Sequence, residues 1–169
     1  MLSRTTAGVI QLGTSALNTA GWFNYGGQAR VTADVTYTST TALANIAGMT
    51  VNVAAGRTYA FQVEVFFTDI AAGGIQLAMA GTATATNIIY NGYIVDSAAN
   101  GIKGNTQATA LATAVANAAT TGANGVAKIS GTITVNAAGT LTVQAAQFAS
   151  NATATTVKRG SFMWVQDMP

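Results

Sequence analysis

A two-residue alternation of side chains is the feature that most restricts the fold of this chain. Residues 59–67 read YAFQVEVFF, in which Tyr, Phe, Val, Val and Phe alternate with Ala, Gln, Glu and Phe. The same period recurs over 129–136 and again after Gly139. Successive side chains of a β-strand point to opposite faces, so this period indicates strands that bury one face.

Other predicted strands follow closely along the chain, with short turns between them. They cover 28–39, 43–53, 74–84, 87–96, 107–119 and 156–168, with Gly-, Asn- and Ala-rich turns expected at 71–74, 99–105 and 121–125. Strand and helix both remain open for 107–119, because its many alanines also favour a helix. About nine strands without a clear intervening helix predict an antiparallel sandwich or barrel.

One phrase occurs twice: TVN followed by AAG, over 50–56 and over 134–139. Each copy lies between two alternating segments, which predicts two strand–turn–strand units, and the four residues that end at Gly139 fit a hairpin. Gly139 is expected to take a left-handed backbone conformation at its turn, with Gly56 as its counterpart. Two copies are too few to indicate a solenoid or a propeller.

The chain has very few charged residues, only 7% of its 169 residues, while Ala and Thr make up more than a third. Charged groups are costly to bury at an interface, so this composition suits packing against copies of the chain or a partner. The net charge is +2, and only Lys158 and Arg159 are adjacent basic residues. A nucleic-acid partner is not expected, because it would require a basic stripe. The N-terminal apolar run is too short for a secretory or membrane segment, so synthesis in the cytoplasm and no membrane association are expected.

The residues of common catalytic and metal sites are missing. The chain contains no His and no Cys, which removes the usual nucleophilic triads and the commonest zinc ligands. None of its acidic residues, Asp34, Glu64, Asp69, Asp96 and Asp167, lies within three positions of another, although two could still pair in space as in glycosidases. We therefore expect no enzymatic activity, no catalytic residue, no metal and no cofactor.

Residues 1–27 show no clean alternation and end in AGWFNYGG. We expect an extended N-terminal arm over 1–27 and a β-sandwich over 28–169. Trp22, Phe23 and Tyr25 either pack on their own sandwich or dock on a neighbouring subunit or partner, where aromatic residues often act as anchors. The second interpretation makes these three residues a candidate partner-binding site.

The last forty or so residues contain a second kind of signal, a strand with G-T-L-x-V-Q-x-A-Q, a small-residue loop, and a closing G-S-x-M-x-V strand. The matching positions are Gly139, Thr140, Leu141, Val143, Gln144, Ala146, Gln147, Gly160, Ser161, Met163 and Val165. Together with 56–67 and 73–81, this pattern resembles the jelly-roll domain of bacteriophage structural proteins, which is similar to the C1q/TNF-like fold. The resemblance implies an all-β antiparallel jelly-roll sandwich and a homotrimer that associates through one sheet.

The predicted final strand is apolar on both faces, with Phe162 and Trp164 on one parity and Met163 and Val165 on the other. A strand of this kind is buried on both sides, either within a large sandwich or against a neighbour. Phe162 and Trp164 are therefore candidate subunit-interface residues.

The resemblance leaves two virion functions open. In the first, the chain is a capsid-decorating or cement trimer that binds the major capsid protein and bridges capsomers. In the second, it is a trimeric tail-fibre or receptor-binding tip that recognises a bacterial surface glycan. The short segment before the first strand favours the first function, because a fibre tip usually follows a long stalk. A secreted C1q-like lectin module is a third alternative, weakened by the lack of a signal segment.

Overall fold

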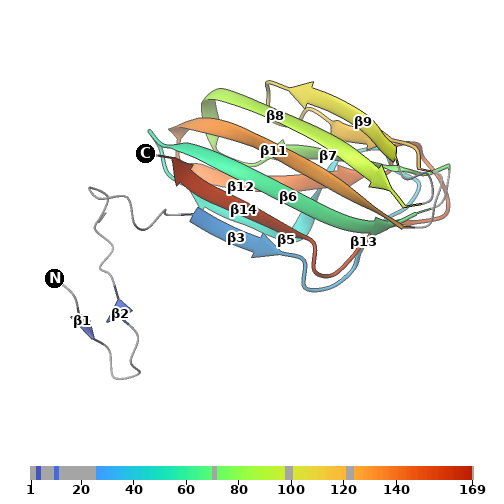
Figure 1. Ribbon diagram of the computed structural model, residues 1–169, viewed down its shortest axis with the longest axis horizontal. Helices are drawn as coiled ribbons and strands as arrows, with labels where there is room; N and C mark the ends of the chain where they lie inside the picture. The colour runs from blue at the N-terminus through green and yellow to red at the C-terminus, as the bar shows by residue number, and fades with distance from the viewer. Residues whose placement is uncertain are drawn as a thin grey trace.

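The computed structural model describes Ser3–Arg4, Ile10–Gln11 and residues 26–69, 72–97, 101–120 and 124–168. All regular structure in these residues is β-strand, and the strands form two antiparallel sheets packed face to face (Figure 1). A short separate ladder pairs β1 (Ser3–Arg4) with β2 (Ile10–Gln11). The sandwich begins with β3 at Gly26.

The larger sheet contains the longest strands of the protein. Across the sheet, its main strands are β3 (Gly26–Arg30), β14 (Phe162–Met168), β6 (Thr58–Thr68), β11 (Asn124–Ala137), β8 (Thr84–Asp96) and β9 (Gly101–Ala108). Two short strands extend it, because β13 (Thr155–Val157) pairs with both the end of β6 and β4 (Val35–Tyr37).

The smaller sheet lies behind the larger one in Figure 1. Across the sheet, its strands are β10 (Val115–Ala118), β7 (Ile75–Ala80), β12 (Gly139–Ala146) and β5 (Ala44–Val53).

The pairing of strands identifies the topology. Without the inserted strands β4, β8, β9 and β13, the sandwich strands follow the chain as β3, β5, β6, β7, β10, β11, β12 and β14. The first pairs with the last, the second with the seventh, the third with the sixth and the fourth with the fifth. This nested pairing of eight strands is a jelly roll. The predicted all-β antiparallel jelly-roll sandwich is therefore confirmed, with the β8–β9 pair as an insertion beside β11.

The core lies between the sheets and is made of the inward parity of each strand. In β6, residues 59, 61, 63, 65 and 67 are buried, as the alternation predicted. Phe61 packs on Tyr90 of β8, with ring centroids 6.3 Å apart. The Tyr90 hydroxyl lies 2.7 Å from the carbonyl oxygen of Thr113 and 3.0 Å from that of Ala110, so it holds the segment before β10. Burial raises the pKa of this hydroxyl.

The repeated phrase forms two crossings between the sheets, so the hairpin expected at Gly139 was wrong. One copy connects β5 in the smaller sheet to β6 in the larger, and the other connects β11 in the larger sheet to β12 in the smaller. The two crossings lie side by side, because Val53 pairs with Gly139 and Thr58 with Thr134. The Gly56 amide donates to the Val135 carbonyl, and the Val135 amide donates to the Arg57 carbonyl, both at 2.8 Å.

Three predicted strands and one predicted turn were partly wrong. The segment 107–119 is neither a single strand nor a helix, because β9 ends at Ala108 and β10 starts only at Val115. Positive φ angles at Ala112 (59°) and Ala116 (49°) accompany this break. The expected turn at 99–105 overlaps β9, and the strands expected at 28–39 and 156–168 are each divided into two.

The two glycines of the repeated phrase have different reasons to be glycine. Gly56 has a φ of 71°, which confirms the left-handed conformation predicted for it. Gly139 does not have a positive φ, so that prediction was wrong. Instead, a Cβ atom at position 139 would lie 2.5 Å from the backbone nitrogen of Ala83 and 2.7 Å from the carbonyl carbon of Thr82. Close approach of two backbones explains the glycine there.

We predict that Gly139→Ala lowers the free energy of unfolding by about 1–3 kcal/mol, because the added methyl overlaps backbone atoms that cannot rotate away. Gly56→Asn is the matched control. It should change stability by no more than about 0.5 kcal/mol, because Asn tolerates a left-handed conformation and the position is a surface turn. Nothing lies within 4 Å of a Cβ atom at Gly56. Urea denaturation followed by circular dichroism measures both, and equal losses would contradict this account.

Candidate functional site

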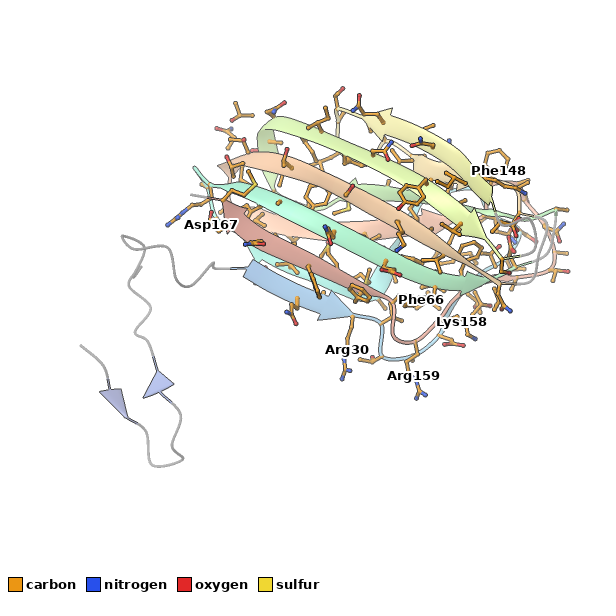
Figure 2. The ribbon with its side chains drawn as sticks, in the orientation of Figure 1. Arg30, Phe66, Phe148, Lys158, Arg159 and Asp167 are labelled. Carbon is orange, nitrogen blue, oxygen red and sulfur yellow. The ribbon has the colours of Figure 1, made fainter. Side chains whose placement is uncertain are left out.

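The outward side of the larger sheet carries most of the large hydrophobic residues that are exposed in the described part of the chain. We call it the outer face: the side chains of β3, β14, β6, β11, β8 and β9 that point away from the core. Seven large hydrophobic residues are exposed, and six are on this face: Phe66, Ile89, Val95, Ile102, Trp164 and Met168. The seventh, Phe148, lies in the loop after β12, while Phe66 lies on β6 (Figure 2). Exposed apolar side chains gathered on one face mark an interaction site.

Phe162 and Trp164 form the aromatic part of the outer face. They are two residues apart on β14, and their ring centroids are 5.8 Å apart with the rings tilted by 40°. Trp164 is 54% exposed, whereas Met163 and Val165 on the opposite parity are buried in the core. Their role at a subunit interface stays a prediction, since the structure contains one chain.

A hollow of about 340 Å³ lies on the outer face beside these two rings. The residues around it are Gln62, Val63, Glu64, Tyr93, Lys128, Ile129, Ser130, Phe162 and Trp164. A cross-strand row places Phe162 opposite Glu64, Glu64 opposite Lys128, and Lys128 opposite Tyr93. The hollow therefore has aromatic rings at both ends and an acid–base pair between them.

The outer face is nearly neutral. Its charged residues on the described strands are Arg30, Glu64 and Lys128. Glu64 and Lys128 form an ion pair with 3.3 Å between Oε1 and Nζ, so they largely cancel each other. Arg30 lies at the edge of the sheet on β3 (Figure 2). A face of this kind can be covered by a copy of itself without strong charge repulsion.

The other predicted site residues, Trp22, Phe23 and Tyr25, lie outside the described residues. The structure does describe the place where they join the sandwich, at the start of β3. A groove of about 620 Å³ lies there, at the free edges of β3 and β5. Its lining residues are Gly27, Gln28, Thr50, Val51, Asn52, Val53, Ala54, Tyr59 and Ala138.

A second polar site, which we call the end cluster, lies where β6 and β8 end: Asp69, Asp96, Lys103 and Thr120. Asp69 and Asp96 are both buried. Lys103 Nζ lies 3.0 Å from Asp96 Oδ2, and the Thr120 hydroxyl donates to Asp69 Oδ2 at 2.6 Å. The other carboxylate oxygen of Asp69, Oδ1, has no hydrogen-bond partner.

The environment of Asp69 favours its neutral form. Burial raises the pKa of Asp69, and the negative charge of Asp96 raises it further. The hydrogen bonds from Thr120 and the Gly74 backbone, together with the positive charge of Lys103, act in the opposite direction but do not reverse the shift. Asp69 therefore holds its proton to a higher pH than an ordinary aspartate.

Other acidic and phenolic groups have simpler surroundings. At the opposite end of the sandwich, buried Asp167 accepts a hydrogen bond from Arg57 at 2.8 Å. On the surface, Asp34 pairs with Lys158 and accepts from the Arg159 amide, and these contacts lower its pKa. Burial raises the pKa of Tyr37, whose hydroxyl has no hydrogen-bond partner, to about 12.

Within the described ranges, no group of three or more Asp, Glu, His or Cys side chains is placed to bind a metal ion. The same residues include no helix of the length and apolarity needed to cross a membrane.

Comparison with known proteins gives little beyond the fold. No protein-family model matches this chain. No curated protein matches it either. Among solved structures, it is similar to an Eiger TNF from S. frugiperda, with 9% sequence identity and a TM-score of 0.41, over 86% of this chain and 93% of that one. At this distance the similarity has no bearing on function.

The end cluster was missed because its residues are far apart in the sequence. A signal was present: Asp69 follows Phe67 on the buried parity of β6, and Asp96 follows Ile94 on the buried parity of β8. An acidic residue at an inward position must find a partner or a proton. The lysine that meets Asp96 is on β9, in a segment where the sequence predicted a turn.

We predict that Asp69→Asn raises the free energy of unfolding at neutral pH, because the asparagine side chain has no charge to bury. The folded pKa of Asp69 is raised, so the wild-type protein loses stability as pH rises from about 4 through that pKa. The variant lacks this loss, so its advantage should vanish near pH 4.

Asp34→Asn is the control with the opposite sign. The folded pKa of Asp34 is lowered by Lys158 and Arg159, so its contribution is present at neutral pH and is lost on acidification. This variant should be no more stable than the wild type at neutral pH. Urea denaturation across this pH range tests both variants. An effect of Asp69→Asn that does not change with pH would contradict the raised pKa of Asp69.

Proposed function

We propose that this chain is a structural protein of a bacteriophage particle, a homotrimer that decorates the capsid and holds neighbouring capsomers together. The observation that carries the proposal is the gathering of exposed hydrophobic residues on the outer face. The virion setting rests on the resemblance of the closing strands, 139–147 and 160–165, to phage jelly-roll proteins.

Self-association through the outer face is supported by its composition. Its exposed apolar residues lie on four of the six strands that define the face. A contiguous apolar surface larger than a few hundred Å² is rare on a protein that works as a monomer. Among the described residues of this face, the one ion pair is internal to one subunit, so closing the interface leaves no unpaired charge there apart from Arg30 at the rim.

A protein that decorates a shell must contact several capsomers, and it needs no catalytic residues. A trimer presents three copies of each weak contact, so the second and third contacts form at a high effective concentration. Because such a protein binds the assembled shell and not its separated subunits, it stabilises the assembled state. In this proposal the trimer resides on the capsid surface and binds the major capsid protein. The arm with Trp22, Phe23 and Tyr25 makes the contact.

We predict that Trp164→Glu weakens subunit association by roughly 30-fold or more, since central aromatic residues at interfaces typically contribute about 2 kcal/mol or more. The side chain is mostly exposed, so the variant should keep the fold of each subunit. Sedimentation velocity at micromolar concentration should give a trimer of the 17.0 kDa chain for the wild type and smaller species for the variant.

Phe148→Glu is the matched control, because Phe148 is an exposed hydrophobic residue outside the outer face. It should sediment as the wild type does. A wild-type protein that is monomeric at this concentration, or equal effects of the two substitutions, would refute the outer face as the interface.

A further prediction concerns the arm. Deleting residues 1–25 should leave a folded trimer that no longer binds its particle, because the sandwich begins at Gly26 and contains all the strands of the jelly roll. Particle binding and the temperature at which the shell ruptures measure the effect. Retained particle binding by the truncated trimer would exclude the arm as anchor. Binding of bacterial surface glycan by a full-length protein without affinity for the shell would favour a receptor-binding tip instead.

A further inference from the structure

The end cluster places an amine and a carboxyl group in contact inside the protein. Lys103 Nζ lies 3.0 Å from Asp96 Oδ2, and the Asp96 side chain is completely buried. The two residues belong to neighbouring strands, since β8 and β9 pair with Ile94 opposite Lys103 and Asp96 opposite Gly101. The backbone therefore holds the two groups together whatever the surface of the protein contacts.

A second buried carboxyl group, that of Asp69, lies at the same end of the sandwich. Asp69 directly follows the last residue of β6 and continues its inward parity, and Asp96 ends β8 on the inward parity. Between them runs β11, where Gly125 pairs with both Phe67 and Asp96, and the Phe67 ring lies directly over this glycine. The charges of Asp96 and Lys103 both act on Asp69, and its buried Oδ1 atom has no hydrogen-bond partner.

We propose that Lys103 and Asp96 condense within the folded protein to form an isopeptide bond that covalently joins β9 to β8, with Asp69 as the proton carrier. This bond would be a modification of the chain made by its own residues. It does not depend on the proposed virion function.

The reaction is balanced without a further reagent. The Lys103 ammonium loses two protons and the amine nitrogen attacks Cγ of Asp96. A bond forms between Nζ and Cγ, and one Cγ–Oδ bond breaks. The departing oxygen takes the two protons and leaves as water. An ammonium and a carboxylate thus become one neutral amide and one water molecule, with no change of oxidation state.

Two physical factors favour the amide at this place. Groups held in contact by a rigid framework react as if their concentration were about 10⁵–10⁸ M, which offsets the tendency of water to hydrolyse an amide. The ion pair is also costly to keep, because the Asp96 carboxylate is completely buried and the Lys103 side chain is only 27% exposed, so both charges lose part of their hydration. Condensation replaces the charges of Lys103 and Asp96 with a neutral group.

The role of Asp69 follows from its surroundings. Condensation needs a group that receives a proton from the ammonium and delivers one to the departing oxygen. Burial and the charge of Asp96 raise the pKa of Asp69, and Thr120 fixes one of its oxygens, which leaves Oδ1 to exchange the proton. A positioned group of this kind contributes about 10²–10⁴-fold to a proton-transfer reaction.

The sequence provides a direct chemical test. Hydroxylamine cleaves Asn–Gly bonds, and the chain has three, at 91–92, 100–101 and 124–125. Cleavage of a linear chain in denaturant gives four fragments, with Asp96 in 92–100 and Lys103 in 101–124. If the bond has formed, these two fragments stay joined as one branched species, and the intact protein is lighter by one water molecule. Mass spectrometry of the intact and cleaved wild-type protein measures both.

Two variants make the test specific. Lys103→Arg keeps a cation beside Asp96 but cannot condense, so it should show its full calculated mass and four linear fragments. Asp69→Asn should form the branched species roughly 10²-fold more slowly than wild type, or slower still, in a time course after cell-free synthesis. Circular dichroism shows whether each variant keeps the β-sandwich.

A wild-type protein that gives only four linear fragments, at its full calculated mass, after prolonged incubation at neutral pH would overturn the proposal. A branched species that also forms in Lys103→Arg would place the link at another residue and overturn it equally. Formation at the wild-type rate in Asp69→Asn would overturn the role given to Asp69.

Discussion

The pairing of the two sheet crossings is the interaction on which the rest of this structure depends. At one end of the sandwich, the chain passes from the smaller sheet to the larger after β5 and returns after β11. Backbone hydrogen bonds join the crossings, from Gly56 to Val135 and from Val135 to Arg57. Because these bonds fix which strands become neighbours, they set the nested pairing of the jelly roll and the register of β6 against β11. That register in turn builds the outer face, where the rows of side chains cross β14, β6, β11 and β8.

The sequence predicted the strands far better than their partners. Period-two alternation locates β5, β6, β11 and β12 within a few residues, because burial of one face imposes that period. It does not say whether two successive strands form a hairpin or cross between sheets, since both need a turn. The repeated phrase was therefore found but misread. Gly139 shows why. A side chain at this position would collide with the backbone of Ala83, which lies on a segment distant in the sequence, so the residues around Gly139 do not reveal the constraint.

The residues of the candidate site were also predictable only where they depend on the strand itself and not on its partners. The outward parity of β14 is visible in the sequence, so Phe162 and Trp164 could be named in advance, and the structure places them on the outer face with most of the exposed large hydrophobic residues that it describes. Ile89 and Ile102 could not be assigned to that face, because the predicted turn at 99–105 hid β9 and its pairing with β8. The end cluster needed the same pairing, since only the β8–β9 register brings Lys103 to Asp96.

Buried acidic residues lie at both ends of the core, and the basic residue that pairs with the acid differs between the two ends. At one end, Asp167 is paired with Arg57, whose side chain is 38% exposed. A guanidinium stays protonated at any ordinary pH and is a poor nucleophile, so this pair can only remain an ion pair. At the other end, Asp96 is paired with a lysine, whose amine becomes a nucleophile once it gives up a proton. Here a second acid, Asp69, is buried nearby with its pKa raised, whereas Asp167 has no such neighbour among the acidic residues that the structure describes. One end therefore has the groups for an acid–base reaction, and the other has only a salt bridge.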